Sequence, residues 1–160
     1  MPIHLKKATN TDIPELIELE KSVAGTKVYS PMLTEDEWLV ALDIGKVYLI
    51  EKDDNIVGNI SYEKRSEDHA HISGLVIEPK FQGQGIGRQA VEQVLKELKD
   101  TKKVTLDVHP KNERALKLYQ PLGFIIESQK ENYYGDNEPR LILVYENNMK
   151  EELEMHDKNL

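Results

Sequence analysis

The segment 71–99, HISGLVIEPKFQGQGIGRQAVEQVLKELK, decides the fold of this chain. Its first part, 71–77, is a short run that ends just before Pro79, which is typical of a β-strand. The next part, 83–87, alternates glycine with other residues and holds too much glycine for the interior of a helix or strand. From residue 88 onward, apolar residues recur at helical spacing with charged residues between them. The segment therefore predicts a strand, a glycine-rich turn and an amphipathic helix.

A glycine-rich turn that leads into a helix is a potential phosphate site. The first N–H groups of a helix have no partner within the helix, and the helix dipole adds partial positive charge there. Gly83, Gly85 and Gly87 carry no Cβ and let a phosphate approach the backbone. Arg88 lies in the first turn, where a cation is unfavourable unless an anion is nearby. A tight turn that binds nothing is the alternative, and the pattern favours the phosphate site.

Two familiar nucleotide-binding loops match this turn less well. The P-loop ends in Gly-Lys-Ser/Thr, which the sequence does not supply here. Residues 85–90 fit the dinucleotide fingerprint G-x-G-x-x-A, and Asp107 lies at about the right distance beyond it. However, the first glycine of that fingerprint directly follows the strand, whereas residues 78–84 intervene here. The chain is also short for that sheet plus a substrate domain.

The rest of the chain predicts strands and helices around this unit. A helix is expected to begin at Asn10 or Thr11 and to continue to about Val23. Thr34 and Glu37 form a capping box that starts a second helix. The remaining strands are expected at residues 3–8, 46–51, 56–63, 103–109, 124–129 and 141–146. Strand–helix alternation flanked by hairpins indicates an α/β or α+β sheet of mixed direction.

Four residues mark irregularities in these elements. Gly74 weakens its strand and predicts a bulge or a close ligand approach. Asn112 is a favourable N-cap for the helix that follows residue 109, and Gly123 is expected to close that helix. Pro121 removes one backbone donor and is expected to distort the last helical turn.

Two motifs resemble those of the GNAT N-acetyltransferases. Residues 82–87, Gln-Gly-Gln-Gly-Ile-Gly, match the acetyl-coenzyme A motif of that family, Gln/Arg-x-x-Gly-x-Gly/Ala. Residues 112–124 match its second segment, N-x-x-A-x-x-x-Y-x-x-x-G-F. The resemblance extends to about Glu146 and is nearest to the ribosomal-protein and N-terminal amine acetyltransferase branch. It implies one α/β (α+β) domain with a mixed, mostly antiparallel central sheet, flanking helices and central strands that splay apart.

The resemblance implies acetyl-CoA as co-substrate. The pantetheine arm would lie between the splayed strands and pair with backbone groups of residues 75–77, and the glycine-rich loop would hold the pyrophosphate. The side chain of Asn112 would also contact the cofactor. The expected cofactor-binding residues are Leu75, Val76, Ile77, Gln82, Gly83, Gln84, Gly85, Ile86, Gly87, Arg88 and Asn112. No metal is expected, and the absence of cysteine excludes thiolate ligands.

Acetyl transfer needs a neutral amine and a proton donor for the departing thiolate. A thiol has a reference pKa of ~8.5 and a tyrosine ~10, so a tyrosine can donate this proton. The resemblance places the acid at Tyr119. It also favours Asp107 as the base, where the N-terminal acetyltransferase branch has a glutamate. Glu78, His71 and His109 are alternative bases.

The acceptor is expected to be an amine. Tyr133 and Tyr134, with acidic residues after them, resemble the Tyr-Tyr segment that binds the acceptor peptide in N-terminal amine acetyltransferases. Residues 138–140, Glu-Pro-Arg, depart from the Glu-Asp-Ala usual there. Tyr29 and Trp38 could touch substrate or lie in the core. A small amine, such as a polyamine or an aminoglycoside-like compound, is a second acceptor class, and a non-catalytic acyl-CoA-binding module is a third function.

Composition bounds the partners and the location. The 160 residues carry a net charge of −8, which argues against a nucleic-acid surface and suits a cationic acceptor. The sequence has no apolar run of membrane-spanning length and no signal-peptide core, so we expect a cytoplasmic enzyme that does not act at a membrane. We expect a monomer or homodimer, with an acetyltransferase domain at 1–146 and an acidic polar tail at 147–160.

Overall fold

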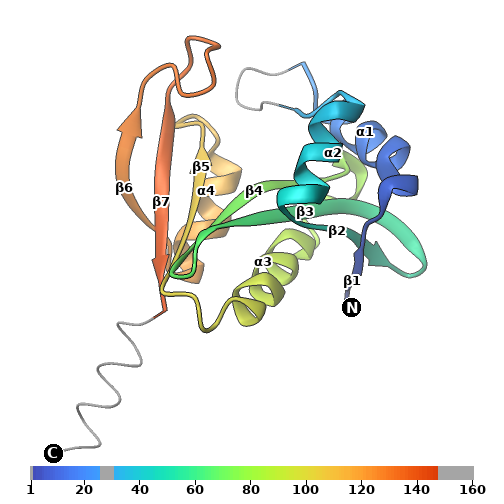
Figure 1. Ribbon diagram of the computed structural model, residues 1–160, viewed down its shortest axis with the longest axis horizontal. Helices are drawn as coiled ribbons and strands as arrows, with labels where there is room; N and C mark the ends of the chain where they lie inside the picture. The colour runs from blue at the N-terminus through green and yellow to red at the C-terminus, as the bar shows by residue number, and fades with distance from the viewer. Residues whose placement is uncertain (1, 26–30, 148–160) are drawn as a thin grey trace, which may run out of the picture.

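A computed structural model of the chain describes residues 2–25 and 31–147 (Figure 1). The described residues form one seven-stranded sheet in the order β1-β2-β3-β4-β5-β7-β6. The strands are β1 His4–Lys7, β2 Gly45–Lys52, β3 Asn55–Ser66, β4 His69–Ile77, β5 Lys103–Val108, β6 Ile125–Lys130 and β7 Arg140–Glu146. The helices are α1 Ile13–Lys21, α2 Glu35–Ile44, α3 Ile86–Glu97 and α4 Glu113–Tyr119, with 3-10 turns at Asn10–Asp12, Pro79–Phe81 and Gln120–Leu122.

The sheet is mixed and mostly antiparallel, as the sequence predicts. Only β4 and β5 are parallel, and every other pair of neighbours is antiparallel. Helices α1 and α2 lie on one face of the N-terminal strands and α3 lies on the other (Figure 1). Two apolar cores result. One lies between the sheet and helices α1 and α2 and contains Leu16, Trp38 and Leu49, and the other lies between the sheet and α3 and contains Val91 and Leu106.

Strands β4 and β5 separate after a short parallel ladder. Their register contains the pairs His69–Lys103, Ala70–Val104 and His71–Thr105, whereas β4 continues to Ile77 and β5 to Val108. The register between β3 and β4 also shifts next to Gly74, which confirms the predicted irregularity in this strand. The central strands are therefore splayed, and the space between their ends is available to other groups.

The start of α1 differs from its prediction. The Thr9 N–H donates to the Asp12 carboxylate at 2.9 Å, and a 3-10 turn precedes the helix. The predicted helix start at Asn10 or Thr11 is therefore wrong. A capping box needs two suitable residues that are three positions apart, and Thr9 and Asp12 have that spacing. The helix also ends at Lys21, before the predicted Val23.

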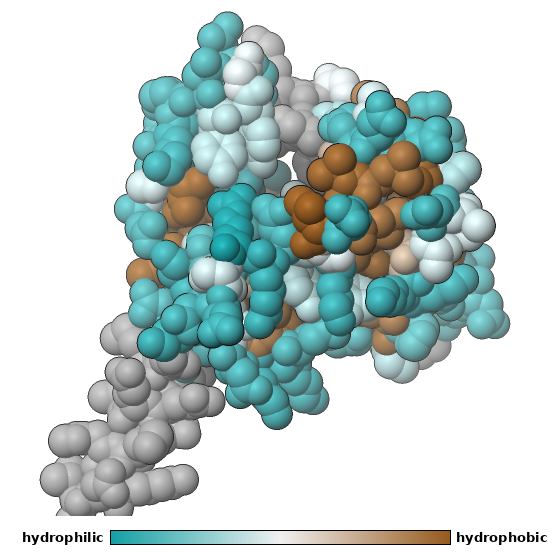
Figure 2. Space-filling model, viewed as in Figure 1, coloured by the Kyte–Doolittle hydropathy of each residue, from teal (hydrophilic) through white to brown (hydrophobic). Residues whose placement is uncertain are grey.

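Helix α2 has one inward anchor and an exposed apolar face. Thr34 caps it as predicted, with Oγ1 accepting the Glu37 N–H at 3.3 Å. Trp38 is 1% exposed, and its indole N–H donates to the Met32 carbonyl at 3.0 Å. Trp38 is thus a core residue, and Tyr29 lies outside the described residues. Figure 2 shows an apolar area where α2 lies, which agrees with the exposure of Leu39, Val40 and Ile44.

The C-terminal part follows the predicted order with a modified helix end. Pro121 lies in the 3-10 turn that replaces a further turn of α4, and Gly123 ends it with φ of 112°. Asn147 donates from its amide to the carbonyls of Leu98 and Thr101, at 3.0 and 2.7 Å. Asn147 is therefore bound to the domain, and the rest of the predicted tail, 148–160, lies outside the described residues.

Candidate active site

A groove of about 550 Å³ runs from the glycine-rich loop to the gap between β4 and β5. Its walls come from the end of β4, the loop before α3, the start of α3, residues 22–24 just after α1, and one side of α4. Gly85 is the N-cap of α3 and has φ of 79°, a left-handed conformation that suits glycine. A Cβ on Gly83 or Gly85 would meet nothing within 4 Å, so the loop backbone faces open space.

The side chains of the loop have different roles from one another. Gln82 lines the groove and donates to the Ile77 carbonyl at 3.0 Å, which ties the loop to the end of β4. Gln84 accepts from Lys52 Nζ at 2.6 Å and is absent from the groove lining. Arg88 lines the groove and pairs with Glu92 at 2.8 Å. The loop thus offers mainly backbone groups, with Arg88 as a nearby cation.

Arg114 is a second cation on the groove that sequence reasoning missed. It belongs to the first turn of α4 and is exposed at the groove. Its position between Asn112 and Ala115 gave no separate signal, because neither motif specifies that residue. Asn112 itself accepts the Ala115 N–H at 3.1 Å, so it caps α4 as predicted and also lines the groove.

The end of β4 presents alternate backbone groups to the gap. The Glu78 N–H donates to the Val57 carbonyl on β3 at 2.8 Å. Backbone groups of successive strand residues face opposite sides, so those of Ile77 face the gap. The Val76 carbonyl faces Gly58 of β3, where it would lie 2.1 Å from an added Cβ. The Val76 carbonyl therefore points toward β3, although Val76 lines the groove together with Leu75 and Ile77.

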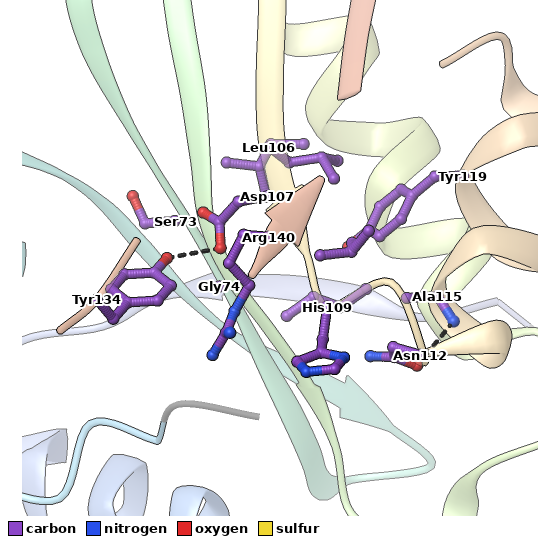
Figure 3. A pocket seen from close by; sticks show the side chains of 13 residues that line it. Ser73, Gly74, Leu106, Asp107, His109, Asn112, Ala115, Tyr119, Tyr134 and Arg140 are labelled. Carbon is purple, nitrogen blue, oxygen red and sulfur yellow. Dashed lines mark hydrogen bonds between the residues drawn. The ribbon is translucent and has the colours of Figure 1, made fainter. Parts of the chain in front are cut away.

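A smaller pocket of about 100 Å³ lies where the two strands diverge (Figure 3). Asp107 and His109 of β5 and its end, Tyr134 of the β6–β7 loop and Arg140 of β7 contribute polar groups to its lining. The pocket and the groove share four lining residues, which are Leu75, Asn112, Ala115 and Tyr119. A molecule in the groove and another in the pocket would therefore meet beside Tyr119.

Tyr119 ends α4 and is held rigidly at this junction. It is 6% exposed, and its ring packs edge-to-face on Phe124 with centroids 5.4 Å apart. In Figure 3 the ring points from α4 into the pocket. Burial, followed by the negative charge of Asp107, raises the pKa of Tyr119 well above its ordinary value. The phenol consequently stays protonated at neutral pH, the form that a proton donor requires.

Asp107 faces the same pocket and is held by two side chains. Tyr134 donates its hydroxyl to Oδ2 at 2.7 Å, and His71 Nε2 lies 3.3 Å from Oδ1 (Figure 3 shows the first contact). Burial and the charge of Asp107 raise the pKa of Tyr134, which keeps its proton on the phenol. Tyr133 lines neither cavity and packs edge-to-face on Tyr134 at 4.8 Å.

The alternative bases are placed less favourably than Asp107. His109 is 3% exposed, and its Nδ1 accepts the Lys111 N–H at 3.1 Å, so Nε2 carries the hydrogen that faces Glu138. That ring has no unoccupied lone pair for a substrate proton. Glu78 lines neither cavity and lies 3.4 Å from Lys80. His71 is buried at 4% exposure and does not line the pocket.

Two further properties of the described part of the chain bear on function. Its His, Asp and Glu residues form no group of three arranged to hold a metal ion. None of its helices is both long and apolar enough to cross a membrane.

Comparison with known proteins agrees with this geometry. Residues 13–124, more than two thirds of the chain, match the family model described as Acetyltransferase (GNAT) family. The chain belongs to the GNAT family. It is 33% identical over 75 residues to the ribosomal protein bS18-alanine N-acetyltransferase of Escherichia coli K12, which covers 46% of this chain and 51% of that protein. The chain spans about half the length of the first curated relatives that it matches.

Solved GNAT structures share the fold over nearly the whole chain. The ribosomal-protein-S18-alanine N-acetyltransferase from Escherichia coli superposes with a TM-score of 0.78 and 20% identity, over 91% of this chain and 94% of that chain. A GNAT family acetyltransferase from Elizabethkingia anophelis with acetyl-CoA bound superposes with a TM-score of 0.72 and 22% identity, over 90% and 97% of the two chains. At these identities the likeness supports the fold, which is the fold that the sequence predicts.

Proposed function

We propose that this protein is an acetyl-CoA-dependent N-acetyltransferase that moves an acetyl group directly to a primary amine. The observation that carries the proposal is the junction of two cavities at Tyr119, with Asp107 across the smaller one. One cavity has a volume of about 550 Å³ and includes the glycine-rich loop in its lining. The other holds a carboxylate where an amine would enter. Family membership supports the same chemistry.

The groove residues fit acetyl-CoA. The backbone around Gly83 and Gly85 opens onto the groove at the N-terminus of α3, where anions bind favourably. Arg88 and Arg114 line the same groove and can approach phosphate oxygens. The backbone of Ile77 faces the gap and can pair with an amide of pantetheine. Bound there, acetyl-CoA supplies the activated acetyl thioester.

Asp107 and Tyr119 divide the proton transfers. The new bond joins the amine nitrogen to the acetyl carbon, and the bond that breaks joins that carbon to sulfur. Asp107 accepts the proton that the nitrogen loses, and the Tyr119 hydroxyl donates a proton to the departing sulfur. Exchange with solvent then returns Asp107 and Tyr119 to their starting forms. These roles match the positions of the two side chains on opposite elements, β5 and α4.

A protein or peptide N-terminus is the proposed acceptor. An α-amine has a reference pKa of ~7.7–8.0, against ~10.4 for lysine, so a much larger fraction of it is already neutral near pH 7 and it needs little help from a base. The relatives named ribosomal protein bS18-alanine N-acetyltransferase support a protein acceptor. Tyr134 of the β6–β7 loop lines the pocket, and Tyr133 packs against its ring.

The test is a free-thiol assay with acetyl-CoA and four acceptor classes: N-terminal peptides, lysine peptides, polyamines and amino sugars. We expect thiol release with N-terminal peptides, and a loss of roughly 10²–10⁴ in rate for Asp107→Asn with unchanged acetyl-CoA affinity. If thiol is released only with polyamines or amino sugars, the protein is an acetyltransferase but its acceptor is a small amine rather than a peptide N-terminus. Acetyl-CoA binding without turnover of any acceptor would favour the non-catalytic binding module.

A further inference from the structure

We infer that His71, oriented by Thr105 and His69, is a positioning residue that holds the Asp107 carboxylate toward the acceptor pocket. This inference rests on the proposed function, because it assigns a role relative to the proposed base. The four side chains form one continuous line of contacts. His69 Nε2 lies 2.7 Å from Thr105 Oγ1, that oxygen lies 2.7 Å from His71 Nδ1, and His71 Nε2 lies 3.3 Å from Asp107 Oδ1.

The register of the sheet explains why Asp107 needs this support. His71 and Thr105 form the last pair of the parallel ladder, so Asp107 is the next residue of β5 on the same face and has no partner on β4. Along β4 and β5, these four residues alternate with residues that pack in the core between the sheet and α3. All four side chains therefore lie on the face of the sheet opposite α3. The alternating core residues are Ala70, Ile72, Val104 and Leu106.

The chemistry of the groups gives the line a direction. A carboxylate only accepts hydrogen bonds, so His71 must donate from Nε2 to Asp107. In a neutral ring Nδ1 then accepts, which requires the Thr105 hydroxyl to donate to it. The Thr105 oxygen in turn accepts from His69 Nε2–H. Three donors thus point toward Asp107 and fix one tautomer of His71.

The surroundings of His69 support a neutral ring at that end. Lys103, Arg65 and His71 face it with positive or potentially positive charge, and Glu127 faces it with negative charge. Burial, followed by Lys103, lowers the pKa of His69 below its ordinary value.

The position of His71 also distinguishes it from a base. Asp107 and Tyr134 line the acceptor pocket, whereas His71 and Thr105 are absent from its lining. His71 therefore lies behind Asp107 and contacts the substrate only through it. His71 is 4% exposed, so its ring is shielded from solvent behind the carboxylate.

A matched pair of variants tests the role. Glutamine places its amide N–H near the position of Nε2 and can still donate to Asp107, whereas asparagine is shorter and reaches only the Nδ1 position. We expect His71→Gln to retain most of the activity and His71→Asn to lose roughly tenfold or more in kcat/KM at pH 7, with unchanged acetyl-CoA affinity. Equal losses in the two variants would overturn the inference.

The pH dependence separates positioning from a general packing defect. At about pH 9 most of an α-amine with a reference pKa of ~7.7–8.0 is already neutral, so less depends on the base. The defect of His71→Asn should therefore shrink from pH 7 to pH 9, as should that of Asp107→Asn. A loss of the same size at both pH values would show a merely structural effect and contradict the proposed role.

A measurement without turnover keeps this inference distinct from the proposed function. In ¹⁵N-histidine NMR spectra of the full chain, His71 should carry its hydrogen on Nε2, which faces Asp107. Thr105→Val should disturb that tautomer, and Thr105→Ser, which keeps the hydroxyl, should preserve it. Hydrogen on Nδ1 of the wild-type ring would overturn the inference even in an active enzyme. Absence of acetyl transfer with the expected tautomer would instead reject the proposed function.

Discussion

Tyr119 is the residue whose removal most directly tests the chemistry. Tyr119→Phe keeps the ring that packs on Phe124 and deletes only the hydroxyl. We expect kcat to fall by roughly 10²–10⁴ and acetyl-CoA affinity to stay the same, because the groove contacts of the ring persist. Thiol release and calorimetry measure the two quantities. Equal turnover in the variant would remove Tyr119 from the mechanism.

Glu20 makes the folding stability depend on pH. It is 3% exposed and accepts the Met32 N–H at 3.3 Å, and burial raises its pKa from 4.5 to about 7. A raised folded-state pKa gives stability that is fully present below pH 4.5 and is lost as pH rises to about 7.

Glu20→Gln should abolish that loss, because glutamine keeps the acceptor oxygen and cannot ionise. The shift corresponds to roughly 3 kcal/mol, so the free energy of unfolding at pH 8 should rise by up to that amount relative to the wild type, and should change little at pH 4. Urea denaturation at the two pH values measures this difference. A variant that is equally destabilised at both would contradict the assignment.

Sequence reasoning proposed Tyr119 and Asp107 as catalytic residues and did not predict the side chains that contact Asp107. Tyr119 lies inside the motif at 112–124, and Asp107 precedes Asn112 by five residues on the strand before that motif. The contact of His71 with Thr105 depends on the register of two strands separated by a helix, which local patterns do not encode. Tyr134 was assigned to the acceptor, and its hydroxyl bond to Asp107 links residues 27 apart in the chain.

At the scale of elements, the loop before α3 gives a test that separates charge from backbone strain. Gly85 has φ of 79°, which asparagine and aspartate tolerate better than other residues, and an added Cβ meets nothing within 4 Å. Gly85→Asp should abolish acetyl-CoA binding, because its carboxylate would face the phosphates. Gly85→Asn, its neutral isostere, should retain much more affinity. Calorimetry measures the acetyl-CoA affinity of both folded variants. Equal affinities would contradict the assignment of this loop as the phosphate site.

The elements themselves were predictable to the extent that local chemistry determines them. The glycine-rich turn, the cap at Thr34 and the irregularity at Gly74 each follow from a few adjacent residues. The start of α1 was misplaced because residues 9–12 are four consecutive polar residues that could each cap it, and the bond from Thr9 to Asp12 selects among them. The splay of β4 and β5 was predicted from the family resemblance, because the sequence of neither strand shows where their pairing stops.

At the scale of the whole molecule, ligand binding should raise thermal stability. The groove is built from α1, β4, α3 and α4, so a ligand in it contacts both layers of helices and the sheet. At a hundred times its Kd, acetyl-CoA should stabilise the fold by ~2.7 kcal/mol, which corresponds to a rise in Tm of roughly 5–10 °C for a chain of this size. Differential scanning fluorimetry measures the rise. Gly85→Asp should show none, and an equal rise in that variant would place the ligand elsewhere.

The short ladder between β4 and β5 also has a consequence for how the protein folds and opens. Strands β2, β3 and β4 are joined by tight turns and pair in chain order, whereas β7 must insert between β5 and β6. Contacts between near neighbours in sequence form sooner than distant ones. The β2–β4 meander should therefore be an early folding unit, and β5–β7 should open from it as a separate unit in native-state hydrogen exchange. Because the ladder between the two units contains three residue pairs, we expect the gap proposed for substrate entry to be also the line along which these units separate.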